Sequence, residues 1–220
     1  MTRSAAHVST LSLFLAFSLA PPRALGADRD ARFAEAARTF QRAAAGDASA
    51  VGRADALFQQ LAAEEPQDPV VLAYAGSSAA MAGRDAASPV DAMNRTELGL
   101  GQIDLALGKL GPEHDAPLPG GLPPRLETLL VAASTFLQVP DSVFHRFADG
   151  RAALSSALSH PLYGRLPPPV QARFQWLAAV VARKDQRPAD ERAALEKALS
   201  LDPSGPLAQQ AGTRLAEVSP

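Results

Sequence analysis

The stretch ERAALEKALSLDP, residues Glu191–Pro203, decides the fold class of this chain of 220 residues. Leu195, Ala198 and Leu199 are spaced so that they fall on one face of an α-helix. An Asp-Pro pair follows, and proline cannot continue a helix. The stretch therefore predicts an amphipathic helix that packs through one apolar face and ends before residue 203.

Weaker copies of this helix recur upstream. Each has apolar residues at similar spacing and is followed by a proline, and these prolines, at positions 66, 112, 161 and 203, lie 46, 49 and 42 residues apart. An apolar segment precedes each copy, so the sequence predicts four helix pairs: 30–45 with 50–64, 70–83 with 90–110, 125–138 with 142–159, and 170–184 with 189–201. Residues 206–218 predict a terminal capping helix.

The second pair carries two local signals. Glycine inside a helix costs about 1 kcal/mol relative to alanine, so Gly76 predicts that another helix passes close to it, the alternative being a tolerated surface residue. Ser88 precedes Pro89, which is the order expected of a helix cap followed by the first helical residue.

The small residues of the first helices and the Ala-rich last helix resemble the tetratricopeptide repeat. The matching residues are Leu72, Ala75, Gly76, Ala79 and Gly83 in one first helix, Ala178, Ala179 and Ala182 in another, and 198–203 (ALSLDP) in the last pair. The resemblance implies an all-α, right-handed α-α superhelix of about four antiparallel helix pairs, made irregular by spacings longer than the standard 34 residues. Residues 72–76 (LAYAG) and 83–85 (GRD) are also similar to exported bacterial proteins of this repeat class without assigned activity.

The first 26 residues are typical of a cleavable signal peptide. Arg3 supplies a positive start, residues 8–20 form an uncharged apolar segment, and ALG at 24–26 provides small residues before a cleavage site. The alternative is an uncleaved membrane anchor, but thirteen residues are fewer than the roughly 20 that a spanning helix needs. We therefore expect residues 27–220 to form a single repeat domain in the periplasm or outside the cell, without membrane insertion.

Composition excludes several classes of function. The chain has no cysteine, which excludes disulfides, thiolate chemistry and a lipid attached to a cysteine. An apolar content of 47% suffices for a core, and Ala and Leu predominate over strand-forming residues. The formal net charge of −2 disfavours nucleic acid as a partner.

Residues suited to catalysis or metal binding do not form a recognisable motif. His114, His145 and His160 are scattered, and the acidic neighbours Glu113 and Asp115 lack a fourth ligand. The adjacent carboxylates at 64 and 65 point about 100° apart on a helix, which favours solvated residues over an acid–base pair. The sequence thus predicts neither a cofactor nor an enzyme.

Surface residues of the first helices are the remaining candidates for function. The resemblance implies that these helices line a concave groove, and the residues placed there are Arg38, Arg42, Tyr74, Ser77, Met81, Glu127, Val131, Arg173, Trp176 and Arg183. Tyr74 and Trp176 are the strongest because rigid aromatic side chains contribute most to binding. The alternative is that both aromatic residues pack inside the helix pairs.

These observations predict a scaffold that binds a protein or peptide partner. The alternatives are an accessory subunit of a cell-envelope transport or assembly complex, and a hydrolase on a helical scaffold that uses carboxylates. The Pro- and Gly-rich segment Glu113–Pro124 predicts a surface loop and is a second candidate binding surface.

Overall fold

A computed structural model of the chain describes residues 22–116 and 121–218, and the secondary structure in these residues is helical throughout. The α-helices are α1 (Pro22–Ala44), α2 (Ala48–Glu64), α3 (Pro69–Arg84), α4 (Pro89–Gly108), α5 (Pro124–Gln138), α6 (Asp141–Phe144), α7 (Phe147–Leu158), α8 (Pro168–Lys184), α9 (Pro188–Leu201) and α10 (Ala208–Glu217). Two short 3₁₀ helices, η1 (Pro112–Asp115) and η2 (Tyr163–Arg165), lie in the connections.

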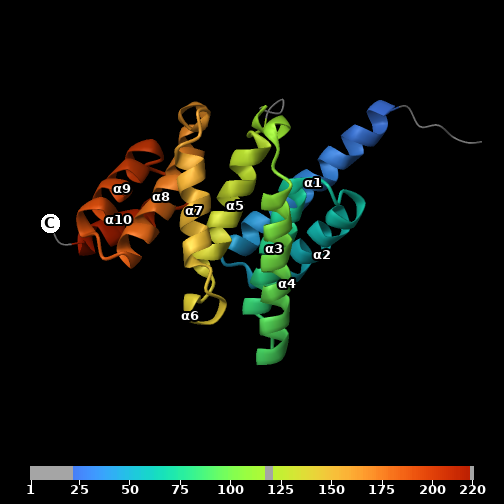
Figure 1. Cartoon of the computed structure of the whole chain (residues 1–220), viewed down its shortest axis with the longest axis horizontal. Coiled ribbons are helices and arrows are strands. Elements are labelled where there is room, and N and C mark those ends of the chain that lie inside the picture. The colour runs from blue at the N-terminus through green and yellow to red at the C-terminus, as the bar shows by residue number, and fades with distance from the viewer. Residues whose placement is uncertain (1–21, 117–120, 219–220) are drawn as a thin grey trace, which may run out of the picture.

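The helices pack in pairs that follow the chain. The helix α1 packs on α2, α3 on α4, α5 on α7 and α8 on α9, and α10 covers α9. Figure 1 shows the pairs side by side, from α1 and α2 at one end to α9 and α10 at the other. The four pairs and the final helix expected from the sequence are therefore present.

The predicted close approach at Gly76 is confirmed. A Cβ atom added to Gly76 would collide with the carbonyl oxygen of Gly99 in α4 and lie 2.7 Å from Cγ1 of Ile103. The helices α3 and α4 thus cross with their backbones in contact, which a side chain at either glycine would prevent. Ser88 caps α4 as predicted, because its hydroxyl accepts a hydrogen bond from the Asp91 backbone N–H at 3.1 Å.

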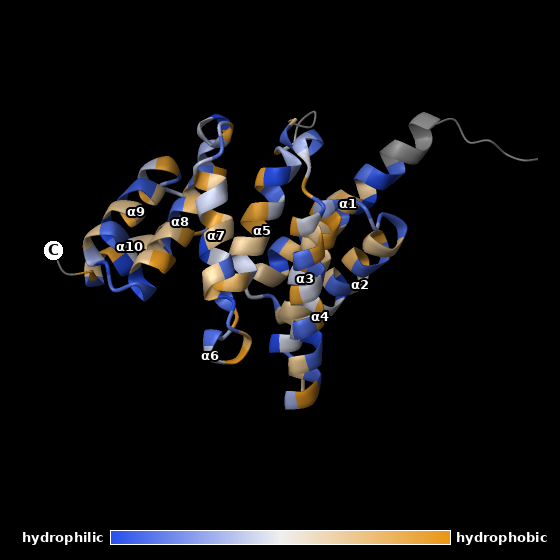
Figure 2. Cartoon of the chain, viewed as in Figure 1, coloured by the Kyte–Doolittle hydropathy of each residue, from blue (hydrophilic) through white to orange (hydrophobic). Residues whose placement is uncertain are grey.

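The core is formed by several adjoining apolar clusters. The largest joins α4, α5, α7 and α8 around Phe136 and Phe174, and another joins α1, α2 and α3 around Phe58. A smaller cluster packs Leu195 of α9 against Ala211 of α10. Figure 2 shows apolar and hydrophilic residues alternating along the helices, as burial of one side requires.

One predicted helix is divided in two. The sequence predicts continuous helix over 142–159, whereas α6 ends at Phe144 and His145 adopts a left-handed conformation, with φ 54°. The Asp141 carboxylate accepts a hydrogen bond from the backbone N–H of Phe147 at 2.8 Å and so caps the start of α7. Arg146, which follows the break, pairs with Asp104 of α4.

The N-terminal region is described only in part. Most of the predicted leader lies outside the described residues, and residues 22–26 form the first turns of α1. Every helix in the described part of the chain is too short or too polar to span a bilayer.

Candidate functional site

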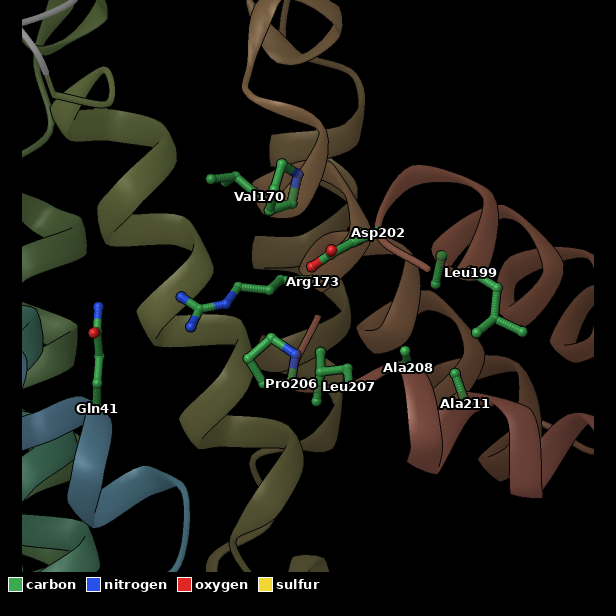
Figure 3. Close-up of a pocket in the computed structure, with 12 residues that line it drawn as sticks. Gln41, Val170, Arg173, Leu199, Asp202, Pro206, Leu207, Ala208 and Ala211 are labelled. Carbon is green, nitrogen blue, oxygen red and sulfur yellow. The ribbon is translucent and has the colours of Figure 1, made fainter. Parts of the chain in front are cut away.

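A cavity of about 240 Å³ lies where α8, α9 and α10 meet, and residue 41 of α1 reaches its edge. We call it the α8–α10 pocket. Its lining is mainly apolar: Pro169, Val170, Ala172, Ala198, Leu199, Pro206, Leu207, Ala208 and Ala211, with Gln41, Arg173 and Asp202 as the polar members. Figure 3 shows these side chains around the opening between α8 and the segment that leads into α10.

The local sequence explains why this pocket forms. Helix α9 ends at Leu201, and Pro203 prevents its continuation. The following turn, residues 202–207, turns the chain so that α10 packs back on α9. Ala211 is 1% exposed, packs on α9 and also lines the pocket, whereas Leu207 and Ala208, at the start of α10, are only half-buried.

Two polar residues of the pocket, Arg173 and Asp202, carry opposite charges but form no ion pair with each other. Figure 3 shows Arg173 extending from α8 toward the side on which Gln41 lies. Arg173 is exposed, and its charge is close enough to α3 to act on the Tyr74 hydroxyl, where it opposes the rise in the pKa of Tyr74. The guanidinium therefore stands at the mouth of the pocket, between α8 and the α1–α3 region.

Tyr74 does not face an open groove. Its ring stacks on Phe58 with centroids 4.9 Å apart and meets Phe33 and Phe40 edge-on. Burial raises the pKa of Tyr74, and its hydroxyl donates a hydrogen bond to Glu127 of α5 at 3.0 Å. Tyr74 thus belongs to the core between the first two helix pairs.

Glu127 is the acceptor of this bond and is itself largely shielded from solvent. Burial raises the pKa of Glu127, and the nearby carboxylate of Asp68 adds to the rise. The hydrogen bond from Tyr74 and the charge of Arg29 act in the opposite direction. The Glu127 side chain therefore links α3 to α5, and its burial favours the neutral, protonated carboxyl group.

Glu127→Gln is expected to make the stability of the fold less dependent on pH. The unfolded chain releases the Glu127 proton near its ordinary pKa, whereas the folded chain retains it to higher pH, so the native state loses stability as pH rises between the two values. The amide removes this loss and can still accept the Tyr74 bond. Urea denaturation from about pH 4 to about pH 8 tests this.

The control for this experiment is Glu97→Gln, because Glu97 is exposed on α4. It should leave the pH dependence of the urea midpoint unchanged. An equal pH dependence in wild type and Glu127→Gln would contradict the assigned role.

The other groove candidates of α3 and α5 also lie in packed surfaces. The hydroxyl of Ser77 is buried and accepts a hydrogen bond from Thr135 of α5 at 2.8 Å. Val131 is 6% exposed, and Met81 is half-buried against the cluster of α1 and α2. The physical reason is that α3 packs on α2, α4 and α5 together, which leaves little of its surface free.

Trp176 lies partly buried between two core clusters and packs against both. The structure thus favours the packing interpretation of this residue over that of an exposed anchor. Arg42 pairs with Asp47, the cap of α2, whereas Arg38 and Arg183 are exposed on α1 and α8. Of the predicted residues, Arg173 alone lines the α8–α10 pocket.

Sequence reasoning missed the pocket residues from α1 and from the segment before α10. Gln41 and Leu207 are far apart in the chain, and no local pattern indicates that they line one cavity. Pro203 predicts the end of a helix, but it does not indicate that a cavity follows.

The second predicted surface, Glu113–Pro124, is described except for residues 117–120. Its start forms η1, in which Asp115 pairs with Arg125 and lies 3.4 Å from His160. These contacts attach the segment to the start of α5 and the end of α7. In the described part of the chain, no group of His, Asp and Glu residues is arranged to hold a metal ion.

No family model, curated protein or solved structure matches this chain, so the pocket must be interpreted from its own residues.

Proposed function

We propose that this chain is an exported helical-repeat scaffold, with an irregular superhelix of the tetratricopeptide type, that binds a segment of a protein or peptide partner. The observation that carries this proposal is the α8–α10 pocket, an open and mainly apolar cavity with a charged side chain at its mouth. Pockets of this composition bind ligands through apolar contacts, while a few polar groups fix the orientation.

The position of the pocket supports a segment of chain as the ligand. It is open to solvent between helices of different pairs and is lined by residues of α1, α8, α9 and α10. An extended segment can therefore place one side chain in the pocket while its backbone continues across the neighbouring helices.

The test is to select peptides from a random library displayed on phage for binding to immobilised protein that consists of residues 27–220. We expect retained peptides to lose at least about tenfold in affinity for Ala208→Phe, because the larger side chain fills the pocket, and a tenfold change corresponds to 1.4 kcal/mol. Gln209→Phe is the matched control, since Gln209 is exposed next to Ala208 and does not line the pocket.

Failure to enrich any peptide, or equal losses for both variants, would contradict the proposal. The proposed export is tested by the intact mass of the chain recovered from the cell envelope, which should be that of residues 27–220 and not of the full chain.

A further inference from the structure

Most arginines of the described residues are paired with a carboxylate. The ion pairs include Arg29 with Glu65 and Asp68, and Arg146 with Asp104. Within residues 28–116 and 121–218, the arginines without such a partner are Arg38, Arg165, Arg173 and Arg183. The pocket is therefore one of the few places in the described residues where an arginine has no carboxylate partner.

One of these four arginines lines the α8–α10 pocket, and a second lies about one helical turn from a lining residue. Arg173 is the lining residue. Arg38 precedes Gln41, which also lines the pocket, by three positions on α1, so Arg38 and Gln41 are neighbours on one face of that helix. Arg38 and Arg173 are both exposed. A ligand seated in the pocket thus meets the positive charge of Arg173, and a segment that continues along α1 from Gln41 toward its N-terminus reaches Arg38.

The lining carries one negative charge, that of Asp202. This residue ends α9, and its side chain lies against the backbone at Gly205, within the turn that leads to α10. Figure 3 shows the Asp202 carboxylate between Val170 and Arg173, while the Arg173 guanidinium extends beyond it toward Gln41 of α1. The cationic edge of the pocket is therefore the edge that faces α1.

The apolar part of the pocket has room for one large side chain. An apolar cavity of about 150 Å³ can hold benzene, and this cavity measures about 240 Å³. Val170, Leu199 and Leu207 provide branched aliphatic contacts for such a group.

From these observations we infer that the segment bound by the α8–α10 pocket is acidic, with one bulky aliphatic or aromatic side chain in the cavity and neighbouring carboxylates at Arg173 and Arg38. This inference rests on the proposed function, because it specifies the chemistry of the same ligand. The apolar side chain supplies most of the affinity, whereas the exposed arginines select acidic over basic segments and accelerate association.

The sequences of peptides retained from the phage library give the first test. We expect Asp or Glu close to Leu, Ile, Met or Phe, and depletion of Lys and Arg. Affinities of a labelled retained peptide, measured by fluorescence anisotropy, should fall about fivefold for Arg173→Gln and for Arg38→Gln, remain near wild type for Arg173→Lys, and weaken as NaCl rises from about 50 mM to about 500 mM.

Arg183→Gln is the matched control. Arg183 belongs to the same helix as Arg173 and is likewise exposed, but it lies in the last turn of α8 and does not line the pocket. Its replacement removes the same charge and should change the affinity by less than about twofold.

The outcomes separate this inference from the proposed function. Retained peptides that are neutral or basic and still depend on Ala208 would overturn the acidic ligand and leave the peptide scaffold standing. Acidic peptides that respond equally to Arg173→Gln and Arg183→Gln would also overturn it, since only general charge would then matter. If no peptide is retained, the proposed function fails together with the inference.

Discussion

Gly99→Ala is expected to lower the free energy of unfolding by about 3 kcal/mol, at the upper end of the cost of overpacking a core. The added methyl group would collide with the carbonyl oxygen of Gly76 and approach the backbone nitrogen of Ala80 to 2.8 Å. Both are backbone atoms, so α3 and α4 must separate and lose packing along the crossing. Urea denaturation followed by circular dichroism measures the change.

Gly101→Ala provides the control on the same helix. A Cβ atom at Gly101 would meet nothing within 4 Å, and replacing a helical glycine by alanine stabilises by about 0.8–1 kcal/mol. The two substitutions are chemically identical and two residues apart, yet they should shift stability in opposite directions. Shifts of the same sign would show that helix propensity, and not the α3–α4 crossing, controls this region.

Phe58→Ala is expected to cost about 3–5 kcal/mol of stability. Phe58 is fully buried in α2, stacks on Tyr74 and meets Phe33 and Phe40 edge-on. Its removal leaves a cavity among rings from three helices that cannot all move inward. Thermal or urea denaturation checks the value, with a lower midpoint as the expected result.

Leu98→Ala is a suitable comparison, because Leu98 is 61% exposed on α4 and its truncation should change stability by no more than about 0.5 kcal/mol. A similarly small effect at Phe58 would mean that the aromatic cluster does not hold the first two helix pairs together.

The sequence alone predicted the helix pairs because their signals are local. Apolar spacing, prolines and the cap at Ser88 each act within a few residues, and the small residue Gly76 indicated a close neighbour without naming it. The break at His145 was not predicted, because a left-handed backbone conformation is usually indicated by a glycine and here the residue is a histidine. Residue spacing on one helix gives no indication of such a conformation.

The candidate site was harder to predict because burial depends on the packing of distant segments. Tyr74 and Glu127 lie on different pairs, and only the packing of α3 against α5 brings them into hydrogen-bonding distance. Their placement in a groove assumed that each first helix has one free face. Arg173 was selected on the same assumption and does line the pocket, because α8 leaves that part of its surface uncovered.

The residues around the α8–α10 pocket come from both ends of the described chain, since Gln41 belongs to α1 and Ala208 to α10. A ligand that contacts both is bound by the folded arrangement of the two ends and not by either end when it is locally unfolded. Mass action then requires that binding suppress the opening of the first and the last helices together. Ligand binding in this one cavity should therefore slow proteolysis of both the first and the last helix.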